Sequence, residues 1–250
     1  MPGATLSFLS VVVGVVGWHV FSLFFPSTLL PGPAEVVDSL RLVWSGGVFL
    51  DAVRATFYHV VVGTGLVIGL GSALGFVMGL WGWAEDTLKP WIPLFQVIPG
   101  VVAMAFALVA FGVGSTGVIF SMLVVGIAYM TLNVWQGFKS IDQDLLEMAE
   151  AFYATRAQVV RYVMLPAIVP HIVSGSRIVL GIAWHVVVFA EFIVGESGIG
   201  KRIDIALYLY NTAEVFGWGG VIIGMMMALD FGILRPLDGH FSRYREAEAG

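Results

Sequence analysis

The stretch VGSTGVIFSMLVVGIAYMTLNVWQGF, residues 113–138, contains no Asp, Glu, Lys or Arg and is long enough to cross a lipid bilayer as one helix. Further long apolar runs occupy residues 8–25, 58–83, 91–111, 172–194 and 215–234, and only the last two carry charge. Their hydrophobicity is continuous rather than alternating, which favours helices over the strands of a membrane barrel. The sequence therefore predicts an all-α integral membrane protein with six transmembrane helices in a single domain, residues 1–250.

The composition of the chain agrees with a membrane location. Of 250 residues, 58% are hydrophobic and 12% are charged, whereas charged residues make up about 25% of an ordinary soluble domain. The chain has no cysteine, which excludes disulfides, thiolate metal sites and cysteine nucleophiles. The formal net charge is −5 and the few Lys and Arg residues are scattered, so no nucleic-acid partner is expected.

The orientation of the spans follows from the basic residues. Residues 8–25 are interpreted as a first span rather than a signal peptide, because no Lys or Arg precedes them and residues 26–28 are a poor cleavage site. With the amino terminus in the cytoplasm, basic residues are more frequent in the inside loops than in the outside loops, as membrane insertion favours. The inside set is Lys89, Lys139, Arg156, Arg161, Arg235, Arg243 and Arg245, and the outside set is Arg41, Arg54, Lys201 and Arg202. We expect a multi-pass protein of the cell inner membrane with both termini cytoplasmic.

Two segments near the amino terminus have clear local signals. The proline-rich start of the connection at residues 26–33 must end the first helix, and residues 34–44 are expected to form a short amphipathic helix at the interface. The six glycines of residues 63–79 include four-residue spacings, which let another helix approach closely. The second span is therefore expected to be an interior, packed helix.

The longest polar interruption, residues 139–171, predicts two short helices outside the membrane. Apolar residues recur at helical spacing from residue 145 to residue 152, and Asp142 or Asp144 can serve as the N-cap. A second helical stretch is expected at residues 156–164, with Pro166 and Pro170 breaking the pattern before the fifth span. The apolar faces of these helices need a cover, and periodicity alone leaves lipid headgroups, the spans above or a docked partner open.

Two short motifs in this segment resemble the cytoplasmic signature of the permease subunits of ATP-binding-cassette importers. The signature begins E-A-A-x-x-x-G and ends with an apolar residue, any residue and L-P. Glu147-Met148-Ala149 is similar to its start, and Val163-Met164-Leu165-Pro166 is similar to its end at the same spacing. Tyr153 occupies the glycine position, and since glycine permits a tight turn there, the geometry of this turn is an open question.

The resemblance extends along most of the chain, to the branch that imports taurine, alkanesulfonates, nitrate and related solutes. Residues 30–36, LPGPAEV, look like its L-P-x-P-x-x-V segment, and residues 111–114, FGVG, look like its F-G-I-G turn. Residues 165–184 follow its L-P-A-x-x-P-x-x-x-x-G-x-R-x-x-x-G-x-x-W course. The resemblance implies a type I ABC importer fold with a cytoplasmic coupling helix.

The resemblance also implies that the transporter contains several subunits with different functions. Two permease copies form a pathway through the bilayer, two separate ATPase subunits use ATP and magnesium, and an extracytoplasmic solute-binding protein delivers a small solute, expected to be anionic. The chain is then a transport subunit rather than an enzyme and binds no cofactor itself. The implied ATPase-docking residues are Glu147, Ala149, Tyr153, Ala154, Thr155, Arg156, Leu165 and Pro166.

One stretch resembles a nucleotide-binding loop without satisfying its pattern. Residues 195–202, GESGIGKR, nearly match G-x-x-x-x-G-K-[ST]. Arg202 stands where a hydroxyl must bind magnesium, and the stretch follows an apolar helix instead of a strand. We interpret it as an outside loop, so the chain is expected to lack its own ATP-driven motor.

Several polar residues within the spans are candidates for the pathway or a gate. Glu191 and Asp230 are costly in a membrane unless they are paired or face water. Each either lines the pathway or forms a gate, or belongs to a structural pair with Arg177, His185 or a backbone donor. His185 is interpreted as a core residue, with a proton carrier as the alternative. Pro93 and Pro99 free carbonyls near Gln96, so the third span either lines the pathway or is simply kinked.

Two other functions are consistent with a bundle of apolar helices. A secondary transporter driven by an ion gradient would use Glu191, His185 and Asp230, but such folds commonly carry internal repeats, and none is evident in the sequence. A membrane-embedded enzyme is the second alternative, yet no metal-ligand pair or nucleophile-and-base cluster appears. The sequence does not identify the solute, nor whether the two permease copies are identical.

Overall fold

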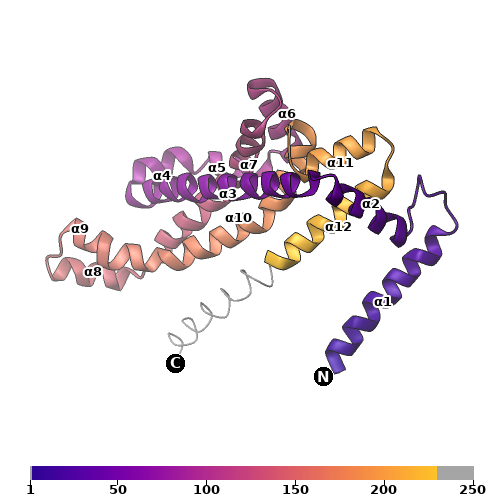
Figure 1. The fold of residues 1–250 in the computed structure, drawn as a ribbon. Coiled ribbons are helices and arrows are strands. Elements are labelled where there is room, and N and C mark those ends of the chain that lie inside the picture. Colours follow the sequence, from indigo (N-terminus) through magenta and orange to yellow (C-terminus); the bar gives the residue numbers. More distant parts are fainter. Residues whose placement is uncertain (1, 230–250) are drawn as a thin grey trace. The chain divides into compact units, whose positions relative to one another are not determined.

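The structure, a computed structural model, describes residues 2–229, and every regular element in that range is a helix (Figure 1). In chain order these are α1 (Pro2–Ser22), α2 (Pro33–Ser45), α3 (Val48–Leu80), α4 (Gly82–Leu88), α5 (Trp91–Val97), α6 (Gly100–Phe111), α7 (Ser115–Lys139), α8 (Gln143–Ala151), α9 (Arg156–Val159), the π-helical turn η1 (Val160–Met164), α10 (Leu165–Val194), α11 (Ile199–Tyr208) and α12 (Thr212–Leu229). The all-α fold class is confirmed. The short interface helix expected at residues 34–44 is α2.

The predicted apolar runs correspond in order to helices. Among the described residues, α3, α7 and the continuous stretch Arg156–Val194 are each long and apolar enough to cross a bilayer alone. The third run, residues 91–111, lies within a broken pair of helical segments, Gly82–Val97 and Gly100–Phe111, bent by 98°. The first and last runs coincide with α1 and α12, whose apolar stretches are shorter. Asp230 and the end of the sixth run lie outside the described residues.

The break in the third run is explained by a proline and the residue before it. Pro99 has no backbone N–H and is the N-cap of α6, with extended dihedral angles of φ −60° and ψ 132°. A residue that precedes proline avoids the α region, and Ile98 has ψ 117° accordingly. The helical hydrogen bonds therefore stop at Val97 and resume at Gly100.

The expectation that Pro166 and Pro170 break the helix before the fifth span is wrong. Pro166 is the second residue of α10, and Pro170 is accommodated inside the helix. The π-helical turn η1 comes directly before them, with the Leu165 N–H bonded to the Val160 carbonyl, five residues back. This wider turn gives the proline ring room, so helical structure continues from Arg156 to Val194.

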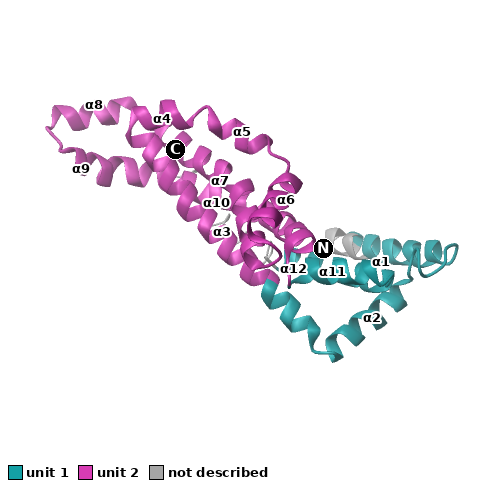
Figure 2. Cartoon of the chain, turned by 90° about the horizontal axis from the view of Figure 1, so that it is seen from above, with its two compact units in different colours: residues 1–55, 197–250 teal, residues 56–196 magenta. Residues whose placement is uncertain are grey.

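Contacts divide the chain into two compact units, one containing residues 1–55 and 197–250 and the other residues 56–196 (Figure 2). In the first unit, the buried residues Ala52, Ile199 and Trp218 form a core, and the ring of Phe49 stacks on Trp218 with centroids 5.7 Å apart. Whether residues 1–250 act as a single membrane domain stays a prediction.

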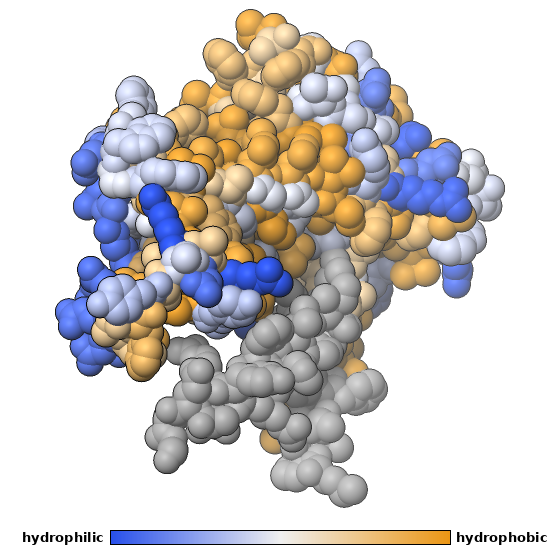
Figure 3. Space-filling view, turned by 90° about the vertical axis from the view of Figure 1, so that its left-hand side faces the viewer, coloured by the Kyte–Doolittle hydropathy of each residue, from blue (hydrophilic) through white to orange (hydrophobic). Residues whose placement is uncertain are grey.

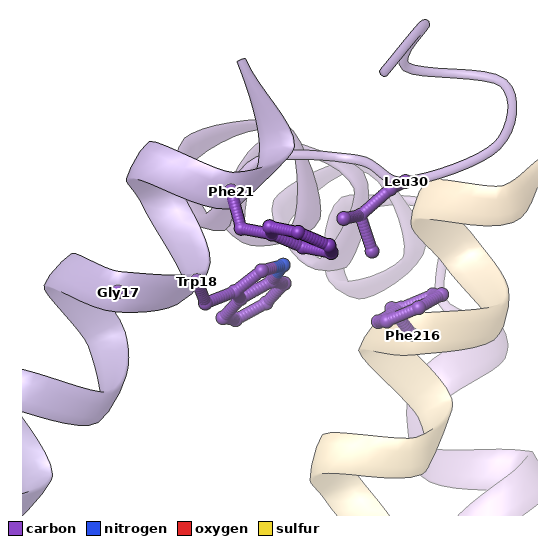
Figure 4. Close-up of a pocket in the computed structure, with 5 residues that line it drawn as sticks. All are labelled: Gly17, Trp18, Phe21, Leu30 and Phe216. Carbon is purple, nitrogen blue, oxygen red and sulfur yellow. The ribbon is translucent and has the colours of Figure 1, made fainter. Parts of the chain in front are cut away.

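An open apolar pocket lies in the first unit between α1, the segment that follows it and α12. Figure 4 shows Trp18 and Phe21 of α1 directed toward Leu30 and toward Phe216 of α12. The Trp18 and Phe216 rings stack with centroids 6.1 Å apart, and the Trp18 indole N–H donates to the Pro31 carbonyl at 3.1 Å. These contacts fix the proline-rich connection against the end of the first span.

The second unit is organised around α3, α7 and α10. Val67 and Met78 of α3 and Met130 and Val134 of α7 are fully buried. The glycines of α3 allow this packing, as the sequence predicted: a Cβ on Gly75 would lie 2.6 Å from the Val134 Cβ and 2.8 Å from the Thr131 carbonyl oxygen. Only a residue without a side chain fits at that distance.

Large apolar side chains remain exposed on many helices of the chain, as expected of a protein that faces lipid. Figure 3, viewed from the side on which Figure 1 places α8 and α9, shows a broad apolar surface with hydrophilic residues gathered in separate patches. Exposed apolar residues on the spans include Val11, Phe57, Val61, Phe106, Val109, Ile178 and Phe189.

Replacing Gly75 by alanine tests the close packing of α3 on α7. We expect Gly75→Ala to destabilise the protein by about 1–3 kcal/mol, because the added methyl group overlaps Val134. Gly69→Ala is the matched control: a Cβ at Gly69 meets nothing within 4 Å, and alanine is the better helix former. Thermal unfolding in detergent measures both, and equal melting temperatures for the two variants would contradict the packing.

Candidate functional site

The polar segment of residues 139–171 folds as a two-helix loop, α8 followed by α9, with both helix starts capped by side chains. Of the two N-cap candidates, Asp142 is the residue used, and its carboxylate accepts the Asp144 N–H at 3.0 Å. At the start of α9, Thr155 and Gln158 form a capping box, in which the Thr155 N–H donates to the Gln158 side chain at 2.8 Å. These side-chain caps define where each of the two short helices begins.

The turn between α8 and α9 is built around Tyr153, which answers the question that the missing glycine raised. Tyr153 has a left-handed backbone, with φ 54°. The Tyr153 N–H donates to the Glu150 carbonyl at 2.9 Å, and the Ala154 N–H donates to the Ala149 carbonyl at 2.9 Å. These two bonds are the Schellman arrangement that ends helices, in which the left-handed residue is usually glycine. The turn geometry is thus kept, at a cost of about 1–2 kcal/mol for the tyrosine Cβ.

The turn presents its aromatic side chains to the outside of the chain. Phe152 is 80% exposed and Tyr153 is 94% exposed. Ala149, by contrast, is buried and anchors α8. Of the remaining predicted docking residues, Glu147, Thr155, Arg156, Leu165 and Pro166 are exposed and Ala154 is half-buried. The turn thus has a backbone fixed by hydrogen bonds and carries two uncovered aromatic rings.

The loop is also tied to the helix ends beside it. The Arg156 guanidinium donates to the Leu80 carbonyl at 3.0 Å. This carbonyl belongs to the last turn of α3, where carbonyls lack helical partners and a cation is favourable. Nearby in the chain, Lys139 at the end of α7 forms a 2.6 Å ion pair with Glu85 of α4. The two-helix loop is therefore connected to α3 by a side chain as well as to α10 by the backbone.

A second candidate site is a buried polar cluster around Glu191, inside the second unit. One Glu191 oxygen accepts the Thr56 hydroxyl at 2.8 Å, and the other lies 2.7 Å from His59 Nδ1. His59 Nε2 lies 2.9 Å from the Ser115 hydroxyl. Glu191 is 0% exposed and His59 is 1% exposed. The cluster links α3, α7 and α10, and a carboxylate needs such partners at membrane depth.

Arg177, one of the partners proposed for Glu191, is excluded by distance. It lies fourteen residues earlier on the same helix, which is about 21 Å away along its axis, so the two cannot pair directly. Thr56 and His59 bind the Glu191 carboxylate, and the sequence reasoning missed them together with Ser115. The available signal was the spacing of Thr56 and His59, which lie three residues apart and thus on one face of the second span.

The other pathway candidates lie elsewhere. His185 is exposed on α10 rather than packed in the core of the chain, so its interpretation as a core residue is wrong. Gln96 is half-buried on α5 and Pro99 is exposed at the break before α6. The sequence predicted a kink near Pro99, and the structure has a break there, with a bend of 98° between the two helices.

Removing the carboxylate tests the importance of the buried cluster. We expect Glu191→Ala to lower the stability by about 1–3 kcal/mol, because Thr56 and His59 lose their buried acceptor. Glu191→Gln keeps an acceptor oxygen and should lose less. Thermal unfolding in detergent is the measurement, with Glu196→Ala as the control, since Glu196 is exposed and its removal should change stability by less than about 0.5 kcal/mol. Equal losses for Glu191→Ala and Glu196→Ala would contradict the cluster.

Comparison with known proteins places these features in a family. The profile of binding-protein-dependent transport system inner membrane components matches residues 65–236. A probable ABC transporter permease protein of Brucella abortus (strain 2308) is 30% identical over 246 residues, which cover 98% of each chain. The taurine transport system permease protein of Escherichia coli (strain K12) is 29% identical over 228 residues, covering 89% of this chain and 83% of that protein.

The fold is also found among solved structures. A chain of the MetNI methionine ABC transporter in an inward-facing conformation aligns with a TM-score of 0.64 and 20% identity, covering 75% of this chain and 94% of that chain. This likeness concerns the fold alone, and it confirms the type I importer architecture expected from the signature. The taurine relative likewise confirms the branch that the motifs suggested. The chain is an ABC importer permease subunit and belongs to the family of binding-protein-dependent transport system inner membrane components.

Proposed function

We propose that this permease forms the membrane pathway for a small anionic solute and is driven by a separate ATPase that docks on the two-helix loop of residues 139–171. The observation that carries this proposal is the turn at Tyr153, where two exposed aromatic rings sit on a fixed backbone. Aromatic side chains supply large contact areas and are frequent at the centres of protein interfaces. A turn that already has its bound conformation loses little entropy when the partner docks.

The docking contact consists of Tyr153, Ala154, Thr155 and Arg156. Glu147, Ala149, Leu165 and Pro166 hold the helices on either side of it. Arg156 can serve both the loop and the partner, because a guanidinium has five N–H donors and the Leu80 carbonyl takes one of them. The faces of α8 and α9 that the sequence left without a cover are then covered by the ATPase.

Two connections carry movement of the loop into the membrane. The backbone is helical from Arg156 to Val194, so displacement of α9 is passed along α10. The Arg156 bond to the Leu80 carbonyl passes the same displacement to the end of α3. Closure of an ATP-bound ATPase pair would thus shift α3 and α10 together between an inward-facing and an outward-facing arrangement.

The pathway is lined by the irregular parts of the spans. The break at Pro99 frees backbone carbonyls beside Gln96, and irregular backbone at membrane depth is tolerated where it lines a cavity. His185, exposed on α10, and Glu191 complete the set of pathway or gate residues. The support for a small solute that carries an acid group is the relative whose name states taurine transport.

The working assembly contains two permease copies, two ATPase subunits and an extracytoplasmic solute-binding protein, in the cell inner membrane. ATP and magnesium are used by the ATPase, and this chain requires no cofactor of its own. Both termini of the permease face the cytoplasm, on the same side as the two-helix loop.

Substitution of Tyr153 tests the docking contact. We expect Tyr153→Gly and Tyr153→Ala both to reduce recovery of the ATPase with the tagged permease, and to reduce ATP-dependent uptake, about tenfold or more. Both variants remove the ring, but only glycine relieves the left-handed backbone. The pair therefore separates loss of the contact from a change in the turn.

The control for this experiment is Tyr162→Ala, which removes an exposed tyrosine of η1 that the proposal places outside the contact. It should leave ATPase recovery unchanged. Full ATPase recovery and full uptake in both Tyr153 variants would rule out docking through this turn. Uptake by the permease alone in liposomes, without ATP, would instead show a secondary transporter.

A further inference from the structure

The described residues contain a second turn with the same construction as the one at Tyr153. Tyr153 and Tyr210 are the two non-glycine residues of the described range that have a positive φ, 54° and 56°. At the end of α11, the Tyr210 N–H donates to the Leu207 carbonyl at 3.1 Å, and the Asn211 N–H donates to the Ala206 carbonyl at 2.8 Å. This is again a Schellman turn with tyrosine where glycine is usual. We call residues 207–211 the Tyr210 turn.

The Tyr210 turn is held firmly on its far side as well. The Asn211 side chain accepts the Glu214 N–H at 3.2 Å and donates to the Glu214 carboxylate at 3.0 Å, which caps the start of α12. The Thr212 hydroxyl donates to the Thr28 carbonyl at 2.6 Å, which ties the turn to the segment after α1. The backbone that presents Tyr210 is therefore fixed by hydrogen bonds before and after it.

In the part of the chain that the structure describes, the side chains of this turn are largely uncovered. Tyr208 is 84% exposed, Leu209 is 64% exposed and Tyr210 is 87% exposed. A left-handed backbone is unfavourable for a residue with a Cβ, and packing inside the chain does not compensate for it here. Strained residues that the surrounding structure holds in place are concentrated at functional surfaces.

The lengths of the helices decide on which side of the membrane the turn lies. α10 has 30 residues, about 45 Å along its axis, and crosses the bilayer once from the two-helix loop. α11 has 10 residues, about 15 Å, and includes Lys201, Arg202 and Asp204, so it cannot cross back. The Tyr210 turn is therefore on the opposite side of the bilayer from the two-helix loop.

We infer that the Tyr210 turn is a docking surface for the extracytoplasmic solute-binding protein. The inference rests on the proposed function, which places the ATPase at the other side. A protein partner fits better than lipid headgroups, because a tyrosine that only anchors the chain in the headgroup layer needs no fixed, strained backbone. A preformed turn instead lowers the entropy lost on binding a folded surface. The tyrosine and leucine side chains of the turn present an apolar area to such a partner, and the tyrosine hydroxyl groups lie at the edge of this area.

The test uses the permease–ATPase complex in lipid nanodiscs, titrated with the purified solute-binding protein of the same transporter. We expect Tyr210→Gly to weaken binding about tenfold, whereas Tyr210→Phe, which keeps the ring, should bind nearly as the unchanged protein does. ATPase recovery should be the same in both. Because glycine suits the left-handed backbone, the melting temperature of Tyr210→Gly should not fall, which separates loss of contact from unfolding.

The outcomes distinguish this inference from the proposed function. If the unchanged permease binds both partners and Tyr210→Gly binds the solute-binding protein equally well, the inference is overturned and ATPase docking stands. If the unchanged permease recovers no ATPase, the proposed function fails by itself. If a fluorophore attached to Tyr210→Cys, which carries the single thiol of the chain, is quenched by spin-labelled phospholipids and does not change on adding the solute-binding protein, the turn belongs to the headgroup layer and the inference is also overturned.

Discussion

The structure depends on one unbroken helical stretch, from Arg156 to Val194. Its first residues belong to the exposed two-helix loop, and its last turns carry Glu191, buried among Thr56, His59 and Ser115. The stretch therefore joins the loop to the buried cluster through one continuous run of helical backbone. The π-helical turn η1 is what lets the stretch continue through Pro166 and Pro170. In the proposed function, this helical stretch connects the ATPase to the pathway.

The bilayer made most of the fold predictable. Each backbone polar group in lipid must be satisfied internally, so a long apolar run has to be a helix, and the runs of the sequence corresponded in order to the helices found. Local chemistry gave further details: it predicted the short helix α2, limited the N-cap of α8 to Asp142 or Asp144, and indicated irregular backbone near Pro99, where the structure has a full break. These features depend on residues close together in the chain, which is why the sequence alone was sufficient for them.

The features that sequence reasoning missed depend on contacts between distant residues or on a choice between conformations of similar energy. Glu191 and Thr56 are separated by 135 positions, and no local pattern connects them. The prolines of α10 were expected to end a helix, but a π-helical turn accommodates them. The backbone at Tyr153 could not be read from the residue type, because the left-handed region is unusual for tyrosine. Here the surrounding hydrogen bonds decide the conformation.

The central claim is that the turn at Tyr153 lies on the cytoplasmic side and touches an ATPase. Because the chain has no cysteine, Ala151→Cys, at an exposed position directly before the turn, introduces a single thiol and leaves Tyr153 in place. A short photo-crosslinking reagent can label this thiol in membranes that contain the whole transporter. The account predicts a crosslink from residue 151 to the ATPase subunit, identified by mass spectrometry, and no labelling of the permease in intact cells by a membrane-impermeant thiol reagent. Labelling from outside the cell, or photo-crosslinks to lipid alone, would contradict it.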